Sequence, residues 1–172
     1  LILPDAWTSF LPGHISQNFV FFLFVLMLLL QTVLSRNLFS FDDAGVIVLG
    51  MLYIGMGFHY FVAARGVGLT VLLYALFIVW VTDSGAYIFG RMFGKHKLAP
   101  RISPNKTWEG SIGGSLAATI LCTAFIAFYP IAGHSLLQMF IFTIILSIAG
   151  QFGDLIESAL KRYYGVKDSG KI

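Results

Sequence analysis

The chain has 172 residues, of which 58% are apolar and only 11% are charged, and its mean hydropathy is +0.84. A soluble globular domain has about 45–50% apolar and about 25% charged residues, so this composition excludes a soluble domain. The 17 Phe residues exclude an intrinsically disordered chain. The single cysteine, Cys122, excludes an intramolecular disulfide and a cysteine-based zinc site. We therefore expect an integral membrane protein.

Residues 1–18 precede the first apolar run and are predicted to form an external loop or an interfacial segment. Five apolar runs follow, each close to the roughly 17–25 residues that a helix needs to cross a bilayer. These runs are 19–34, 44–63, 69–88, 111–130 and 135–153. None alternates apolar and polar residues as barrel strands do. The sequence therefore predicts an all-α, polytopic transmembrane helical bundle of about five spans with cytoplasmic catalytic loops.

The connecting segments complete the predicted domain organisation. Three spans within 19–88 are followed by a basic loop at 89–110, two spans within 111–153, and a helix extension at 154–172. This order places ten of the eleven Lys and Arg residues on one side of the membrane and only Arg65 on the other. Cytoplasmic loops carry an excess of positive charge, so the basic loop and the helix extension are predicted to be cytoplasmic.

Asp83 lies near the cytoplasmic end of the third predicted span. An acidic residue at the centre of a membrane helix costs about 2.5–3.5 kcal/mol, so it usually faces protein or a water-filled cavity. Gly85 beside it allows a ligand or another backbone to come close. The alternative is a boundary aspartate whose side chain simply reaches the headgroup region.

The basic loop contains a dense run of small polar side chains around one lysine. Ser103, Asn105 and Thr107 can bond to phosphate oxygens or to a base, and Lys106 supplies a point charge for phosphate. The GxxxxGK[ST] pattern of a Walker loop is absent from the sequence. The run favours an anion site, and the alternative is a topogenic loop attracted to anionic lipid headgroups.

A helix that continues from the fifth span would place Asp154, Glu157, Ser158 and Lys161 at i, i+3, i+4 and i+7, on one face. Carboxylates beside a hydroxyl and an ammonium suit a Mg²⁺-bridged phosphate. Gly165 is predicted to end the helix. The alternative is a solvated helix end with ordinary i,i+4 ion pairs.

Three stretches of the sequence match the motifs of one known family. Ser-Ala-Leu-Lys-Arg at 158–162, followed by Lys-Asp-Ser-Gly at 167–170, resembles the opening half of the signature of the phosphatidate cytidylyltransferase (CDP-diacylglycerol synthase) family. Asp-Ser-Gly-Ala-Tyr at 83–87 and Ser-Pro-Asn-Lys-Thr-Trp-Glu-Gly at 103–110 are similar to the bacterial members. The family signature continues with Gly-His-Gly-Gly and Asp-Arg-x-Asp elements that this sequence does not contain. We therefore expect the chain to be an incomplete enzyme.

The resemblance implies transfer of CMP from CTP to phosphatidic acid, giving CDP-diacylglycerol and pyrophosphate in phospholipid biosynthesis. It implies Mg²⁺ at Asp154, with a second cation left open. The implied partners are CTP, phosphatidic acid and membrane lipid but no nucleic acid, and a homodimer is left open. The implied location is the bacterial inner membrane, with the active face cytoplasmic.

The same resemblance assigns roles to individual side chains. The implied catalytic residues are Asp154, Lys161, Arg162, Lys167 and Asp168. The implied substrate-binding residues are Asp83, Ser103, Asn105, Lys106, Thr107 and Ser158. Lys106, Lys161 and Arg162 would hold phosphates, and Asp83 would ligate a cation or orient the cradle.

Two other functions remain open at this point. A related CTP-dependent polyprenol or archaeal-lipid transferase would share the same charge layout. An ion-coupled transporter using Asp83 belongs to a different class, and it predicts inverted repeats and polar residues near the midplane of several spans. Neither feature is evident in the sequence, because the polar residues gather at one interface.

The predicted topology can be tested by cysteine labelling. Single cysteines placed at positions 40, 98 and 165 should react with a membrane-impermeant thiol reagent only from the cytoplasmic side, because all three lie in segments assigned to the positive face. Labelling of position 98 from outside would contradict the layout, since the basic loop anchors it.

Overall fold

A computed structural model describes residues 16–166, which form two compact units divided after Gly68. The first contains α2 (Gln17–Leu34) and α3 (Phe41–Val67). The second contains α4 (Leu69–Phe93), β1 (Lys97–Ala99), β2 (Ser103–Thr107), α5 (Trp108–Phe128) and α6 (Leu136–Tyr163). Most of the predicted segment 1–18, and the predicted site residues Lys167 and Asp168, lie outside the described residues.

In the first unit, side-chain caps define the ends of both helices. The hydroxyl oxygen of Ser16 accepts from the amide of Phe19 at the start of α2. Ser40 and Asp43 form a reciprocal capping box at the start of α3, which satisfies amides that have no partner within the helix. Between the helices, Arg36 and Asn37 adopt positive φ values of 54° and 62° and turn the chain.

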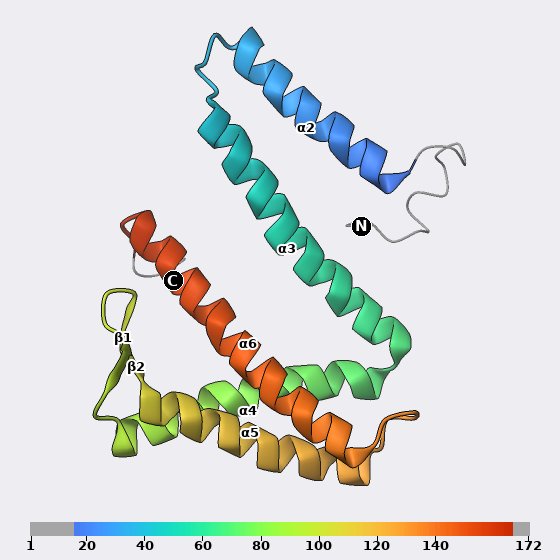
Figure 1. Cartoon of the computed structure of the whole chain (residues 1–172), viewed down its shortest axis with the longest axis vertical. Helices are drawn as coiled ribbons and strands as arrows, with labels where there is room; N and C mark the ends of the chain where they lie inside the picture. The colour runs from blue at the N-terminus through green and yellow to red at the C-terminus, as the bar shows by residue number, and fades with distance from the viewer. Residues whose placement is uncertain (1–15, 167–172) are drawn as a thin grey trace. The chain divides into compact units, whose positions relative to one another are not determined.

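In the second unit, α4 and α5 run alongside each other and α6 packs against both (Figure 1). Glycines allow the close approach of α4 and α5. A Cβ on Gly85 would lie 3.0 Å from the Cα of Gly114, and a Cβ on Gly114 would lie 2.5 Å from the carbonyl oxygen of Thr82. Small residues at such contacts are typical of membrane helices, whose association depends on close packing rather than on the hydrophobic effect.

Farther along the same three helices lies a small buried core. Its members come from α4, α5 and α6, and they are Tyr74, Ile78, Ala118, Cys122, Ile126 and Met139. The hydroxyl of Tyr74 donates to the carbonyl oxygen of Met139 at 2.9 Å and lies 2.6 Å from Oγ1 of Thr143. The buried phenol therefore has the polar partners that its burial requires.

The structure differs from the predicted loop at 89–110. Helix α4 continues to Phe93, and two short strands then form an antiparallel hairpin in which Lys97 pairs with Thr107. Pro100 lies in the turn, where the amide of Ile102 donates to the carbonyl oxygen of Ala99 at 3.1 Å. Proline favours this turn position because its φ is already fixed. The strands are too short and too polar to be predicted from periodicity alone.

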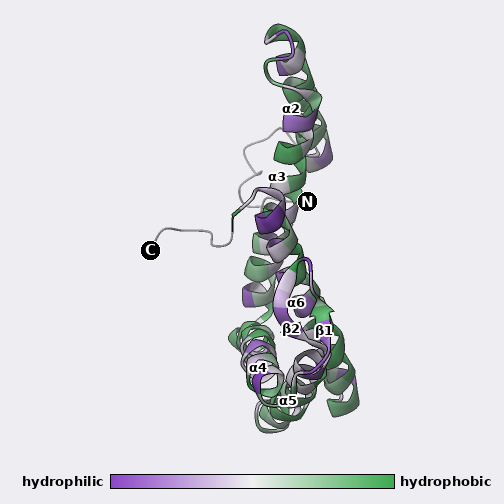
Figure 2. Cartoon of the chain, turned by 90° about the vertical axis from the view of Figure 1, so that its left-hand side faces the viewer, coloured by the Kyte–Doolittle hydropathy of each residue, from purple (hydrophilic) through white to green (hydrophobic). Residues whose placement is uncertain are grey.

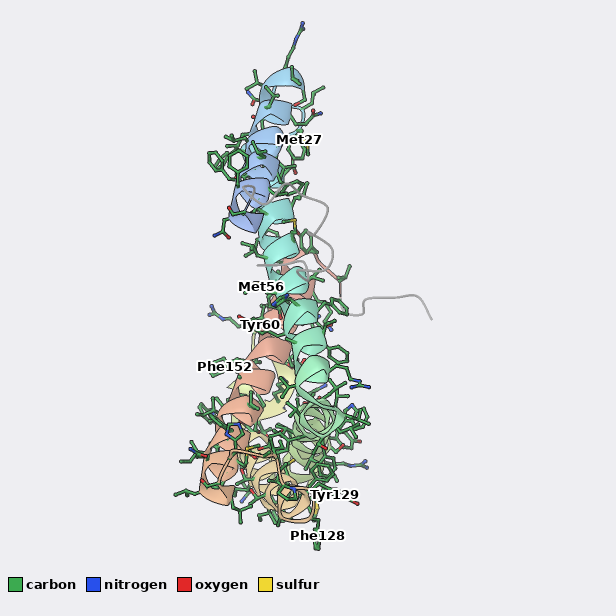
Figure 3. All side chains as sticks on the ribbon, turned by 90° about the vertical axis from the view of Figure 1, so that its right-hand side faces the viewer. Met27, Met56, Tyr60, Phe128, Tyr129 and Phe152 are labelled. Carbon is green, nitrogen blue, oxygen red and sulfur yellow. The ribbon has the colours of Figure 1, made fainter. Side chains whose placement is uncertain are left out.

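Among residues 16–166, four helices, α3, α4, α5 and α6, are long and apolar enough to cross a membrane, and α2 is a shorter apolar helix. Hydrophobic residues occur along all of these helices (Figure 2). Large apolar side chains also point outward, as Phe128 does at the end of α5, where it is 81% exposed (Figure 3). The chain is an integral membrane protein of the predicted polytopic helical class, with one local hairpin added.

One helix boundary differs from the prediction, and another agrees with it. Only Gly68 separates α3 from α4, where the sequence predicted a connection at 64–68. Helix α6 continues without a break from its apolar part to Tyr163, as predicted for the helix extension. Gly165 has a φ of +68°, and the amides of Gly165 and Val166 donate to the carbonyls of Arg162 and Lys161, which ends the helix.

The glycine contact predicts opposite effects for two matched substitutions. Gly114→Ala should destabilise the protein by about 1–3 kcal/mol, because the new methyl group would overlap the backbone of α4. Gly150→Ala on α6 meets nothing within 4 Å and should stabilise its helix by about 0.5–1 kcal/mol. Unfolding of both variants in detergent measures the difference. A neutral Gly114→Ala variant would contradict the proposed close contact.

Candidate functional site

A polar cavity of about 380 Å³ lies in the second unit, where α4, α5, α6 and the hairpin meet. Eight of its eleven lining residues have charged, amide or hydroxyl side chains. The polar lining residues are Asp83, Tyr87, Asn105, Lys106, Thr107, Ser111, Gln151 and Asp154. The cavity therefore brings together the three sequence stretches that were singled out separately above.

Lys106 and Asp154 form an ion pair across this cavity, between the Nζ and Oδ2 atoms. Lys106 is on β2 and Asp154 is on α6, so the pair joins the hairpin to a helix that follows much later in the chain. Asp83, on α4, lies within electrostatic range of both side chains. Three helical or strand elements thus each contribute one charged group to a single cavity.

The hairpin is held in place at its base and at its tip. At the base, the carboxylate of Glu109 accepts from the amides of Lys95 and His96 and lies 2.6 Å from Nδ1 of His96. At the tip, Nε of Arg162 on α6 donates to the carbonyl oxygen of Ile102 at 3.2 Å. These contacts fix the strand that carries Lys106 relative to α5 and α6.

The last residue of β2 also caps the next helix. The Oγ1 atom of Thr107 accepts from the amide of Gly110 at 3.1 Å, and Thr107 is buried. Thr107 is therefore the N-cap of α5 as well as a lining residue of the cavity. Strand and helix follow one another directly, which places Asn105 and Lys106 beside the first turn of α5.

The cavity lining carries more negative than positive charge. Asp83 and Asp154 contribute two carboxylates, and Lys106 contributes one ammonium group. An anionic ligand would be repelled from this lining unless a cation accompanied it. The oxygen-rich lining suits a hard cation such as Mg²⁺, which usually takes one or two protein carboxylates together with substrate phosphates and water.

Asp154 and Asp83 are the side chains that could hold such a cation. Within residues 16–166, no group of three or more His, Cys, Asp or Glu side chains lies close enough together to form an all-protein metal site. A cation at this cavity would therefore need oxygen ligands from a bound phosphate as well.

Other predicted site residues lie outside the cavity lining. Lys161 pairs with Glu157 at 3.1 Å, as the i,i+4 alternative predicted. Arg162 contacts the hairpin tip, as described above. Ser103 lies where β2 begins and Ser158 lies on α6, and neither lines the cavity.

The sequence analysis missed three polar lining residues, Tyr87, Ser111 and Gln151. Gln151 precedes Asp154 by three residues on α6, so helical i,i+3 spacing places both on one face. That spacing was the available signal. No comparable sequence signal marked Ser111, because its place in the cavity lining depends on how closely α5 approaches α6.

A second, apolar cavity of about 680 Å³ lies between α5 and α6. It shares Leu98, Ser111 and Gln151 with the polar cavity, so the two adjoin. The remaining lining is mainly aliphatic and aromatic and includes Trp108 and Phe152. In Figure 3, Phe152 points away from the ribbon of α6. The polar cavity thus borders this apolar cavity, which we call the apolar groove. The helices that line them, α4, α5 and α6, are long enough to cross a membrane.

Comparison with known proteins gives consistent matches over nearly the whole chain. The model of the family described as "Cytidylyltransferase family" matches residues 3–172. The phosphatidate cytidylyltransferase of Bacillus subtilis is 48% identical over 176 residues, covering 99% of this chain and 64% of the relative. The phosphatidate cytidylyltransferase of Staphylococcus haemolyticus is 53% identical over 177 residues, covering 100% of this chain and 65% of the relative. The chain thus spans about two thirds of the length of these relatives.

Proposed function

This chain belongs to the cytidylyltransferase family, and from this premise we propose that its full-length protein transfers CMP from CTP to phosphatidic acid. The products are CDP-diacylglycerol and pyrophosphate. The observation that carries the proposal is the single cavity in which Lys106, Asp154 and Asp83 meet. Relatives that are 48% and 53% identical bear the name phosphatidate cytidylyltransferase, which supports the same reaction.

In the proposed reaction, a phosphate oxygen of phosphatidic acid attacks the α-phosphorus of CTP. A new P–O bond forms, the bond from the α-phosphorus to the bridging oxygen breaks, and the electron pair leaves with pyrophosphate. Such transfers need positioning and charge stabilisation more than a protein nucleophile. A bound Mg²⁺ would supply positive charge to the triphosphate, and Asp154 and Asp83 are the side chains that would hold it.

Lys106 is the side chain best placed to contact the nucleotide. Its ammonium group would leave Asp154 and donate to a phosphate oxygen, which exchanges one charged partner for another. Asn105, next to it on β2, would donate its amide to the nucleotide, and Ser111 offers a hydroxyl from α5. Lys161 and Arg162 lie along α6 beyond the lining, where they would attract anionic substrates toward the cavity.

The lipid substrate would approach along the apolar groove. A molecule with an anionic head and apolar tails matches a polar cavity that adjoins an apolar groove. Its head would contact the polar lining, and its tails would contact the apolar lining. CTP would arrive from the cytosol. The ten of eleven basic residues assigned to one face support a cytoplasmic orientation of the cavity in a bacterial inner membrane.

Asp154→Asn in the full-length protein should abolish Mg²⁺-dependent CMP transfer while the protein remains folded. Asparagine is nearly isosteric with aspartate, so the substitution removes a charged ligand without opening a space. Incorporation of radiolabelled CTP into lipid, measured beside the melting temperature in detergent, checks both parts. Activity within about threefold of the wild type, less than the loss typical for a metal-site partner, would mean that Asp154 is a structural residue.

Lys106→Ala and Lys97→Ala form a matched pair within the hairpin. Lys106→Ala should weaken CTP use by about 1.5–3 kcal/mol, the range for a hydrogen bond to a charged group. This corresponds to roughly tenfold or more. Lys97 lies on β1 outside the cavity lining, and its diffuse attraction to lipid is worth about 1 kcal/mol and is screened by salt.

The same CTP assay, run for both variants at two salt concentrations, separates specific binding from general attraction. Equal, salt-sensitive losses for Lys106→Ala and Lys97→Ala would show that the hairpin acts only as an electrostatic anchor. The expected result is a large loss for Lys106→Ala that salt does not change, and a smaller loss for Lys97→Ala that salt reduces.

A further inference from the structure

Four hydrogen-bonded side chains cross the three helices of the second unit, next to the cavity. Thr82 on α4 donates to Oγ of Ser147 on α6 at 2.9 Å, and Ser147 donates to Oγ of Ser115 on α5 at 3.0 Å. Nε2 of Gln151 on α6 donates to the same Ser115 Oγ at 2.8 Å and lies 3.4 Å from the carbonyl oxygen of Ser111. We call Thr82, Ser147, Ser115 and Gln151 the hydroxyl–amide network.

Both ends of the network adjoin the carboxylates of the cavity. Thr82 directly precedes Asp83 on α4. Gln151 precedes Asp154 by three residues on α6, which places the two on one helix face, and both line the cavity. The network therefore connects the two carboxylate-bearing helices at the level of the carboxylates themselves.

Burial distinguishes this network from an incidental surface contact. Thr82 is 2% exposed and Ser147 is 1% exposed. Ser115 and Gln151 are half-buried. Hydrogen bonds are directional, so buried bonds that run from α4 through α6 to α5 resist sliding or rotation of any one helix.

A purely structural role is the alternative. Tyr74, Thr143 and the Met139 carbonyl form a second buried polar cluster between α4 and α6, and it also joins those helices. Polar bonds between membrane helices contribute only about 0.6 kcal/mol on average. The second cluster lies near the other end of α6 and does not line the cavity, so it provides the comparison that separates the two roles.

We propose that the hydroxyl–amide network consists of positioning residues, which fix the spacing of Asp83 and Asp154 so that both can serve one cation–phosphate complex. The inference rests on the proposed function for the identity of that complex. Mg²⁺ demands near-ideal octahedral geometry at 2.0–2.1 Å, so a small shift of α6 relative to α4 would weaken its binding. Side chains that orient metal ligands typically affect metal affinity or activity by about 10–100-fold.

The test compares the Ser115→Ala, Gln151→Leu double variant with Thr143→Val in the full-length protein. Thr143→Val is the matched control, because it removes a fully buried hydroxyl from the same helix interface, away from the cavity. Ser115→Thr keeps the hydroxyl and serves as the conservative rescue. Gln151→Met removes the amide alone, and it replaces the double variant if that protein does not fold.

Three measurements are made for each variant. The first is crosslinking by a short bifunctional thiol reagent, in a separate Asp83→Cys, Asp154→Cys, Cys122→Ala background. This readout reports helix spacing and needs neither metal nor activity. The second is the Mg²⁺ concentration that gives half-maximal CMP transfer and the third is the melting temperature, both measured with Asp83, Asp154 and Cys122 intact.

The double variant should lose crosslinking, and its half-maximal Mg²⁺ concentration should rise by about 10–100-fold. Thr143→Val should lower the melting temperature to a similar extent while keeping both the crosslink and the Mg²⁺ requirement, and Ser115→Thr should resemble the wild type. Retention of the crosslink in the double variant would overturn the proposal. Absence of CMP transfer by the wild type would overturn the proposed function instead, and crosslinking would then decide the positioning role alone.

Discussion

The close approach of α4 and α5 is the constraint on which the site depends. Gly85, Gly110 and Gly114 allow the two backbones to approach closely, and an added Cβ on Gly110 would lie 2.6 Å from the carbonyl oxygen of Ala86. In a bilayer, lipid tails cover apolar helix surface as well as another helix does, so the hydrophobic effect does not drive helices together. Helix association is then most favourable where two backbones can pack closely. Because α4 and α5 form one tight pair, α6 can contact both and bring Asp154 to the same cavity as Asp83.

The Lys106–Asp154 ion pair has a second role besides joining the hairpin to α6. A carboxylate pair without a partner would be costly in the low dielectric near a membrane, and the lysine offsets part of that charge. In the proposed reaction, an anionic substrate that enters with a cation would give both members of the pair new partners of opposite sign. Lys106 and Asp154 would therefore each have an oppositely charged partner in either state.

Much of this organisation could be predicted from the sequence because bilayer physics leaves strong signals. Long apolar runs locate α3 to α6. Asp83, the stretch around Lys106 and Asp154 each stand out because charged side chains are rare within or beside apolar spans. That these three meet in one cavity could not be derived from local pattern, since it depends on α4–α5 glycine packing and on the hairpin. The family resemblance supplied that connection instead.

The features that the sequence analysis missed share a physical reason. The hairpin strands have three and five residues, so they carry too few side chains for a period to appear. The bond from Nε of Arg162 to the carbonyl oxygen of Ile102 joins residues 60 positions apart, so no local pattern indicates it. Gln151 and Ser115 resemble ordinary polar residues in apolar helices until the pairing of α5 and α6 places one beside the other.

The direct junction of β2 and α5 limits how this region can change during evolution. Strand ends at Thr107 and helix begins at Trp108, with no intervening linker. A helix turns about 100° per residue, so inserting or deleting one residue after the hairpin would rotate Gly110, Gly113 and Gly114 away from α4 unless the hairpin moved with them. Length variation should therefore be tolerated in the Tyr129–Ser135 connection between α5 and α6, and strongly selected against between Lys106 and Gly114.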